Sequence, residues 1–251
     1  MSDPTQRFSN RAANYVKYRP GYPPEVMELF RDEMGLTPDS TVADIGSGTG
    51  ISAKIFLENG NSVYGVEPND TMRAAGEEFL ASFPQFRSVK GTAENTGLAG
   101  GSVDIVFAAQ AFHWFDQEKT RNEFIRILKP GGHTALIWNE RQLNTTPFLR
   151  DYEQFLLNFA DDYTRVRHEN VNEAALKAFF QKDFRKAVFS NSQVLDHEGL
   201  LGRVLSSSYM PDEAHPRFSE MQNELGALVA NHAENGNIEL LYDTTIYYTQ
   251  F

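Results

Sequence analysis

The sequence predicts an α/β fold: a doubly wound, mostly parallel sheet of seven strands, with helical lid insertions and an antiparallel strand at the C-terminal edge. Strand-like and helix-like segments alternate between residues 41 and 140, as in successive βαβ units. The strand-like segments are apolar on both faces, which fits a sheet that helices cover on both sides. Glycines cluster where the first strand meets its helix, and such a loop lies at the ligand-binding edge of this kind of sheet.

Two helices are expected ahead of the sheet. Residues 7–17 have helical character, which the Pro-Gly pair at residues 20–21 ends. Pro24 suits the first turn of the next helix, whose apolar residues recur at helical spacing until Gly35.

The alternating region then supplies five strands and the helices between them. The strands are short apolar runs and are expected at residues 41–45, 62–67, 86–90, 103–108 and 134–138. The helices between them are expected at residues 51–57, 72–83 and 119–128. The segment Lys129-Pro130-Gly131-Gly132 closes the last helix.

After residue 139 the alternation fails. Helices are expected at residues 147–159, 172–180, 197–205 and 216–233, and strands at residues 185–194 and 238–251. The last strand is rich in β-branched and aromatic residues, and we expect it to pair antiparallel with the other at the sheet edge. The chain is expected to form a single domain over residues 1–251, with an N-terminal helical lid (8–35), a ligand-binding core (41–140), a helical cap (145–235) and a C-terminal strand (238–251).

Composition narrows the class of partner and compartment. The formal net charge is -11, which repels phosphate backbones and anionic lipid, so we expect neither a nucleic acid nor a membrane partner. There are no cysteines, which excludes disulfides and thiolate metal sites. The polar N-terminus and the absence of a long apolar run predict a cytoplasmic protein, whose oligomeric state the sequence leaves open.

The glycine loop has the spacing Gly46-x-Gly48-x-Gly50 at a strand-to-helix junction. Glycines there permit positive φ and let a ligand approach the backbone. A dinucleotide site requires G-x-G-x-x-G, and Ile51 stands at its third glycine position. Asp44 precedes the loop, and a carboxylate suits a cationic ligand better than a pyrophosphate.

Glu67 ends the second predicted strand. A carboxylate at this point can accept two hydrogen bonds from a ribose diol, as the equivalent acid does in dinucleotide sites. An isolated Glu in a loop is usually solvated, but its position after the glycine loop favours the ligand-binding interpretation.

At these residues the chain resembles class I S-adenosylmethionine-dependent methyltransferases of the type 11 group, and within it the trans-aconitate methyltransferase-like enzymes that act on small molecules. The similarity covers residues 8–140 well and the C-terminal third loosely. The segments that carry it are Arg7-Phe8-Ser9, Tyr18-Arg19-Pro20-Gly21-Tyr22-Pro23, the glycine loop with Asp44, Val66-Glu67-Pro68, Gly91-Thr92-Ala93-Glu94, Gln110-Ala111-Phe112-His113-Trp114-Phe115 and Leu128-Lys129-Pro130-Gly131-Gly132.

The resemblance implies a Rossmann-like fold and S-adenosyl-L-methionine as cofactor. It implies that the glycine loop passes the methionine part and ribose, that Asp44 faces the amino group, and that Glu67 binds the ribose hydroxyls. The remaining implied contacts lie beside the adenine or on the methionine side. The full set of implied cofactor residues is Asp44, Gly46, Ser47, Gly48, Gly50, Glu67, Pro68, Met72, Ala93, Glu94, Gln110 and Phe112.

The methyl acceptor is expected to be a small molecule with a carboxylate or a hydroxyl group. Relatives that methylate bases or amides carry an Asn/Asp-Pro-Pro-aromatic turn where this chain has residues 110–113, which argues against those acceptors. His113 is the candidate general base, although it could equally pack among aromatic neighbours. Candidate acceptor residues are Tyr18, Arg19, His113, Trp114 and Tyr209, with Arg141 and Arg203 as further cations and Tyr15 as a polar neighbour.

Two other functions stay open at this point. An NAD-type oxidoreductase is disfavoured by the glycine spacing, and a regulatory protein that binds the cofactor without turnover would carry the same motifs. No metal site is expected, because His197 and Glu198 are adjacent rather than on one helical face, and Asp161-Asp162 lacks the spacing of a metal loop.

Overall fold

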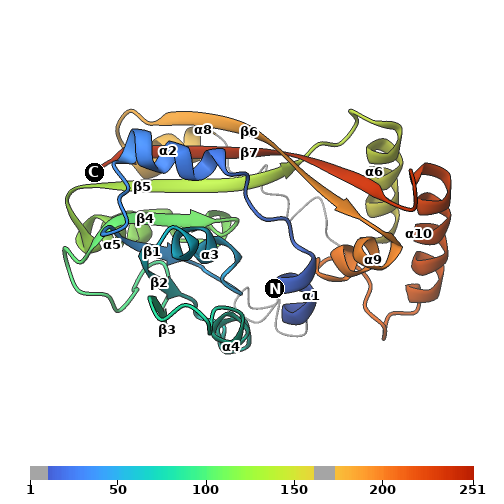
Figure 1. Ribbon diagram of the computed structural model, residues 1–251, viewed down its shortest axis with the longest axis horizontal. Coiled ribbons are helices and arrows are strands. Elements are labelled where there is room, and N and C mark those ends of the chain that lie inside the picture. Colours follow the sequence, from blue (N-terminus) through green and yellow to red (C-terminus); the bar gives the residue numbers. More distant parts are fainter. Residues whose placement is uncertain (1–10, 161–172) are drawn as a thin grey trace.

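A computed structural model describes residues 11–160 and 173–251 of the chain (Figure 1). Its sheet has seven strands in the order β3-β2-β1-β4-β5-β7-β6. The strands are β1 (Thr41–Ile45), β2 (Ser62–Val66), β3 (Phe86–Val89), β4 (Val103–Ala109), β5 (Leu128–Arg141), β6 (Arg185–Leu195) and β7 (Ile238–Gln250). Strands β1 to β5 pair in parallel, and β7 is antiparallel to both β5 and β6. This confirms the predicted Rossmann-like fold with antiparallel C-terminal pairing.

Helices cover both faces of the sheet, as its apolar strands require. They are α1 (Ala12–Tyr18), α2 (Glu25–Met34), α3 (Ile51–Glu58), α4 (Asp70–Phe79), α5 (Gln117–Ile127), α6 (Pro147–Phe159), α8 (Glu173–Phe180), α9 (His197–Leu205) and α10 (Phe218–His232), with a 3₁₀ turn, η3 (Phe112–Trp114). Buried residues of α2 and α3 pack on one face, and those of α5 and α8 pack on the other.

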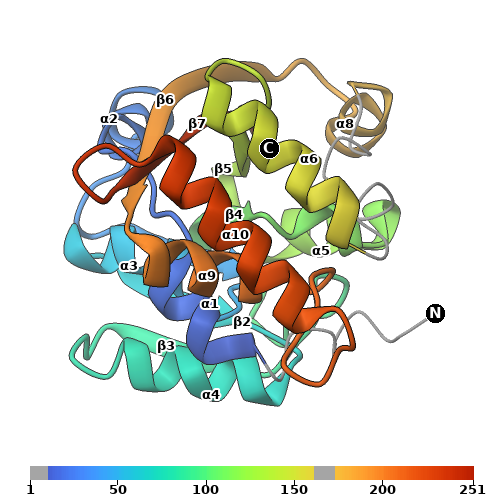
Figure 2. The ribbon, with the colours of Figure 1, turned by 90° about the vertical axis from the view of Figure 1, so that its right-hand side faces the viewer.

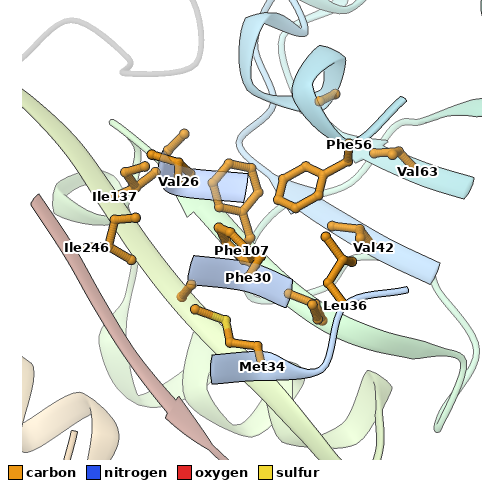
Figure 3. Packing of buried hydrophobic residues seen from close by; sticks show 14 of the residues in the cluster. Val26, Phe30, Met34, Leu36, Val42, Phe56, Val63, Phe107, Ile137 and Ile246 are labelled. Atoms are coloured by element: carbon orange, nitrogen blue, oxygen red, sulfur yellow. The ribbon is translucent and has the colours of Figure 1, made fainter. Parts of the chain in front are cut away.

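The first face is built around three edge-to-face phenylalanines (Figure 3). The ring centroids of Phe30 and Phe56 lie 4.9 Å apart, and those of Phe56 and Phe107 lie 5.1 Å apart. Each side chain is fully buried, so this contact fixes α2 and α3 on the sheet. Replacing any of these rings with Ala would cost about 3–5 kcal/mol.

Long strands connect the sheet to a helical cap. β5, β7 and β6 extend past the other strands toward α6, α9 and α10 (Figures 1 and 2). Ile246 and Tyr248 of β7 pack in the core of the sheet, whereas Ile238, Leu240 and Tyr242 pack among the cap helices. The same strand therefore contributes to both hydrophobic clusters and holds the cap in register with the sheet.

Three details depart from the sequence-based elements. β5 begins at Leu128 rather than at residue 134, and a register shift on its partner β4, between Val103 and Ile105, accommodates the extra residues of the Pro-Gly-Gly segment. The C-terminal strand lies between β5 and β6, so β6 occupies the edge. The beginning of the first predicted helix and the segment with Asp161-Asp162 lie outside the described residues.

Candidate active site

The glycine loop between β1 and α3 is held by its own backbone donors. The Gly46 and Ser47 N–H groups donate to the Val66 carbonyl over 2.9 and 3.1 Å, and Gly48 N–H donates to Glu67 Oε2 over 2.9 Å. A loop that cradles a pyrophosphate needs such N–H groups free to face the ligand. These three donors are already used, so the loop is poorly suited to phosphate, in agreement with its spacing.

All three glycines of the loop have positive φ, but they differ in what an added Cβ would meet. A Cβ on Gly46, at φ +71°, would lie 2.7 Å from Ala111 Cβ. A Cβ on Gly50, at φ +82°, would lie 2.5 Å from Leu80 Cδ1. Gly48, at φ +55°, has only the Met72 methyl nearby, at 3.4 Å. Gly46 and Gly50 are therefore required by packing, while Gly48 leaves its space open.

Asp44, at the end of β1, is fully buried. Its Oδ2 accepts from Ser52 Oγ at 2.6 Å, while Oδ1 has no hydrogen-bond partner among the described residues. Burial, reinforced by the nearby Glu67 carboxylate and opposed by the Ser52 hydrogen bond, raises the pKa of Asp44 to about 7. A cationic ligand group beside Oδ1 would satisfy the orphan oxygen and favour the ionised form. The site therefore fits the ammonium group of S-adenosylmethionine.

Glu67 connects the glycine loop to the start of α4. Its Oε1 accepts from Asn69 N–H at 2.8 Å and its Oε2 from Gly48 N–H at 2.9 Å. Burial raises its pKa, and these two backbone hydrogen bonds oppose that rise. Each carboxylate oxygen keeps one lone pair, so Glu67 can hold the loop and still accept from a diol.

A cleft of about 620 Å³ opens between the sheet and the cap. Its floor comes from the glycine loop and the ends of β4 and β5, and its other walls come from the N-terminal segment, the end of α9 and β7. Residues that line it include Tyr15, Arg19, Tyr22, Gly46, Ser47, Gly48, Gln110, His113, Trp114, Asn139, Glu140, Arg141, Arg203, Tyr209, Tyr242 and Asp243. Its position at the carboxyl ends of parallel strands is where ligands bind in this fold class.

Four of the predicted cofactor residues line this cleft: Gly46, Ser47, Gly48 and Gln110. Gln110 has φ +57°, an uncommon backbone conformation for a residue with a side chain, where β4 gives way to η3. The remaining eight are not among its lining residues, namely Asp44, Gly50, Glu67, Pro68, Met72, Ala93, Glu94 and Phe112.

Phe112, another of the predicted cofactor residues, packs in the core. It is fully buried and packs edge-to-face on Phe179 of α8, with ring centroids 4.7 Å apart. Phe112 belongs to the core on the α8 side of the sheet and is not among the residues that line the cleft. Glu94 is engaged as well, because its Oε1 accepts from Asp116 N–H at 2.9 Å near the start of α5.

Among the predicted acceptor residues, Arg19, His113, Trp114 and Tyr209 line the cleft. Tyr18 is not among the lining residues. Its ring covers Gly202 of α9, where a Cβ would lie 2.1 Å from the ring, and its hydroxyl donates to Glu198 Oε1 at 3.1 Å. The phenols that reach the cleft from this segment belong to Tyr15 and Tyr22.

Sequence reasoning missed much of the cap side of the cleft. Asn139, Glu140, Tyr242 and Asp243 line it because β5 and β7 run beyond the sheet. A signal existed for β5, since the carboxyl end of each parallel strand in this fold faces the ligand edge. Tyr22 lines the cleft as well. Burial raises the pKa of its phenol well above the usual value, while a hydrogen bond with Gln110 opposes the rise.

The described residues contain no cluster of three or more His, Asp or Glu side chains that could hold a metal ion. None of the helices in the same part of the chain combines the length and apolar character needed to cross a membrane.

Comparison with known proteins places this geometry in a family. Residues 43–136, which include the glycine loop and β4, match a family model described as a methyltransferase domain. A relative from Mycobacterium sp. strain JLS, an uncharacterized methyltransferase, is 33% identical over 215 residues, covering 81% of this chain and 77% of the relative. An uncharacterized methyltransferase from Schizosaccharomyces pombe is 34% identical over 150 residues, covering 59% of this chain and 58% of the relative.

The chain thus spans little more than half the length of some relatives that it matches. A solved structure from Anaeromyxobacter dehalogenans, described as a candidate type II methyltransferase, has the same fold with a TM-score of 0.67 and 20% identity over 93% of this chain and 98% of that one. Because the Mycobacterium relative is similar along most of both chains, the chain belongs to the class I S-adenosylmethionine-dependent methyltransferase family.

Proposed function

We propose that this chain transfers the methyl group of S-adenosylmethionine to a small-molecule acceptor bound in the cleft. The observation that carries the proposal is the buried Asp44 carboxylate beside the glycine loop, one oxygen of which has no hydrogen-bond partner among residues 11–160 and 173–251. When bound, the cofactor supplies a methyl group on a positively charged sulfur. Asp44 would bind the amino group of the cofactor, and Glu67 would bind its ribose hydroxyls. Gly48, which has no side chain, would let the cofactor come close to the backbone of the loop.

The chain's contribution to such a reaction is alignment and exclusion of water. Methyl transfer from a sulfonium is an in-line displacement with a good leaving group, so the two reactants need mainly to be held in line. A cleft of about 620 Å³ has the size of a small-molecule site. The N-terminal segment and the cap form its walls opposite the glycine loop, where they can keep water from the reacting atoms.

The acceptor would be a carboxylate or a hydroxyl compound, because the cleft is lined by the cations Arg19 and Arg203 and by His113. A carboxylate arrives ionised and needs no base. A hydroxyl group would need one, and His113 lines the cleft at a position where it could take that proton. Its ring also packs against Trp114, with centroids 4.8 Å apart, which is a purely structural role. His113→Gln should abolish turnover of hydroxyl acceptors and spare carboxylates.

The N-terminal segment would act as a lid. Tyr15, Arg19 and Tyr22 line the cleft, and α1 lies beside α9 of the cap (Figure 2). We expect hydrogen exchange of residues 11–22 to slow when S-adenosylhomocysteine binds, because closing contacts would offset the entropy of ordering the segment. Equal protection in the free and bound protein would show that the segment is a fixed wall.

Calorimetric titration tests the cofactor assignment. S-adenosylmethionine and S-adenosylhomocysteine should bind at about micromolar strength, and NADH should not bind. Tight NADH binding without a response to either sulfur nucleoside would refute the proposal. A methyl-transfer assay over carboxylic acids, phenols and amines then separates an enzyme from a regulatory protein that binds the cofactor without turnover.

A further inference from the structure

Two arginines in the cleft wall converge on one hydroxyl group. Arg19 comes from the N-terminal segment and Arg203 from α9. Arg19 Nη2 donates to Ser207 Oγ at 3.3 Å and Arg203 Nη1 donates to the same oxygen at 3.1 Å. Ser207 is 1% exposed, so the two guanidinium groups meet at a buried point beside the cleft that both of them line.

Neither guanidinium has a carboxylate partner among the described residues. Arg19 donates otherwise to the Ser206 carbonyl, at 3.1 Å, and stacks on the Tyr15 ring at 4.7 Å. The Nε donors of Arg19 and Arg203 are buried and find no acceptor in the part of the chain that the structure describes. Arg203 is only 9% exposed, and an uncompensated charge at that burial is costly.

The other charged groups of the cleft do not neutralise this pair. Arg141 is bound to Glu153, and Asp243 Oδ1 accepts from Gln142 at 2.9 Å. Glu140 Oε2 accepts from Thr245 at 3.3 Å. The groups facing Arg203 from α6, β7 and the loop after α9 are the phenols of Tyr152, Tyr242 and Tyr209. Burial lowers the pKa of Arg203, but these phenols, including a hydrogen bond with Tyr242, raise it above its usual value. The pKa of Arg19 is lowered by burial and by the neighbouring Arg203, as expected of two like charges.

We propose that Arg19 and Arg203 together bind the anionic oxygen group, a carboxylate or a phosphate, of the small acceptor. Calling the bound anion a methyl acceptor rests on the proposed function. The anion site itself is inferred from the positions of the two arginines alone. Two guanidinium groups present planar sets of donors that match such oxygens. In a chain of net charge -11, an anion would be drawn to the cleft only by such a local concentration of positive charge.

Both residues lie outside residues 43–136, the part that matches the family model. The glycine loop would therefore serve the cofactor, while the N-terminal segment and the cap would determine which acceptor is bound. The anionic group would be held on the cap side, so the atom to be methylated would extend toward the glycine loop. A neutral acceptor of the same size would leave the pair uncompensated and bind weakly.

Binding of matched anionic and neutral probes tests this. Succinate, benzoate and inorganic phosphate would be titrated into the free and the S-adenosylhomocysteine-loaded protein, alongside succinamide and benzamide. At least one carboxylate should bind about tenfold or more tightly than its amide, since charge-assisted bonds are the stronger ones. If phosphate binds as tightly as the carboxylates, the arginine pair is a general oxyanion site. If phosphate binds more weakly, the pair is selective for carboxylates.

Arg19→Gln and Arg203→Gln should each reduce this preference to about threefold or less, and Arg203→Lys should retain part of it. Arg31→Gln is the matched control, because Arg31 lies exposed on α2 away from the cleft. Affinity for S-adenosylhomocysteine should stay within about threefold in all variants, which also reports that they fold.

Equal binding of acids and amides by the wild-type protein, no binding of any anion, or a preference that persists in both Gln variants would overturn the proposal. Cofactor binding without anion preference would reject only the arginine pair. Anion preference without cofactor binding would reject only the proposed methyl transfer.

Discussion

The two walls of the cleft are built in opposite ways. On the sheet side, the glycine loop and Glu67 follow adjacent strands, and backbone N–H groups of the loop join them, as from Gly48 to Glu67, 19 positions away along the chain. On the cap side, Arg19 bonds to Ser206, 187 positions away along the chain. The first wall follows from local strand-to-helix geometry, whereas the second exists only once the cap has folded.

The walls also leave different groups unsatisfied. Among the described residues, Asp44 Oδ1 behind the glycine loop is an acceptor without a hydrogen-bond partner, and the Nε atoms of Arg19 and Arg203 on the cap side are donors without one. A cleft with this polarity suits a cation on the first wall and an anion on the second. The following changes test whether the two walls are as separate as this suggests.

The largest effect is expected from Gly46→Ala. A Cβ at φ +71° costs about 1–2 kcal/mol, and its 2.7 Å approach to Ala111 adds roughly 1–3 kcal/mol of overpacking. The free energy of unfolding, measured in urea, should fall by about 2–5 kcal/mol. In the fraction of this variant that stays folded, the cap should keep its wild-type structure.

Gly48→Ala is the matched control on the same loop. Its Cβ would meet only the Met72 methyl, at 3.4 Å, so it should lose just the 1–2 kcal/mol or so of backbone strain. Its cofactor affinity should fall more than that of any stable cap variant. Equal stability losses in the two variants would show that packing against Ala111 does not distinguish them.

The fold was largely predictable because its signals are local. Apolar runs and glycines marked β1, β2 and β4, and the amphipathic faces marked α2 and α5. The position of β7 between β5 and β6 was not predictable, since it depends on pairing over long sequence separations. The early start of β5 was missed because Pro-Gly-Gly normally ends an element, whereas here a register shift accommodates it.

The site was predictable on one wall only. Asp44, Glu67 and the glycines form a motif with fixed spacing, so sequence could bring them together, and the structure lays them around one loop. Tyr18 and Phe112 sit in the right segments, but their side chains point elsewhere because α9 and α8 supply partners that the sequence does not reveal. Which face of a short segment meets the cleft is decided by tertiary packing.

The next effect concerns the attachment of the N-terminal segment to the cap. Arg11 is 8% exposed and donates to the carbonyls of Leu205, Ser207 and Met210 over 2.5–2.9 Å. Arg11→Gln should cost about 2–4 kcal/mol in urea unfolding, because buried carbonyls lose charge-assisted bonds. Arg31→Gln, at an exposed site, should cost less than about 1 kcal/mol. If Arg11→Gln lowers cofactor affinity as well as stability, the cap-side wall and the cofactor-side wall are not independent.

A smaller effect is expected from pH acting on Asp44. Its pKa of about 7 lies above the ordinary 3.8, so the free folded protein retains a proton that the unfolded chain releases. Stability should therefore decline as pH rises from about 4 to 7, and Asp44→Asn should remove that slope. If the ionised Asp44 carboxylate binds the ammonium group of the cofactor, as proposed, affinity should weaken as pH falls below 7, by up to about tenfold per unit.

Calorimetric titration with S-adenosylhomocysteine between pH 5 and 8 checks this. Asp44→Asn should bind about tenfold to a hundredfold more weakly at pH 8 and without the pH slope. Asp104→Asn is the control, since Asp104 pairs with Lys129 at the opposite end of β4. A wild-type affinity that is constant over this range would show that Asp44 does not contact the charged group.

The smallest effect is expected from Tyr18→Phe. The Tyr18 hydroxyl donates to Glu198 at an exposed position and is directed away from the cleft, so its loss should cost well under 1 kcal/mol and change turnover by less than about twofold. Tyr22→Phe is the matched comparison, because that phenol lines the cleft, hydrogen-bonds Gln110 and lies near Asp44. It should lower turnover about tenfold if the phenol helps to position the reactants, since an unpaired buried partner costs roughly 1–3 kcal/mol. The two variants differ by one oxygen atom each and come from one segment, so overall loosening of the lid would affect both. A tenfold loss of turnover in Tyr18→Phe, with unchanged turnover in Tyr22→Phe, would reverse the assignment. It would show that the face of α1 that carries Tyr18 meets the acceptor.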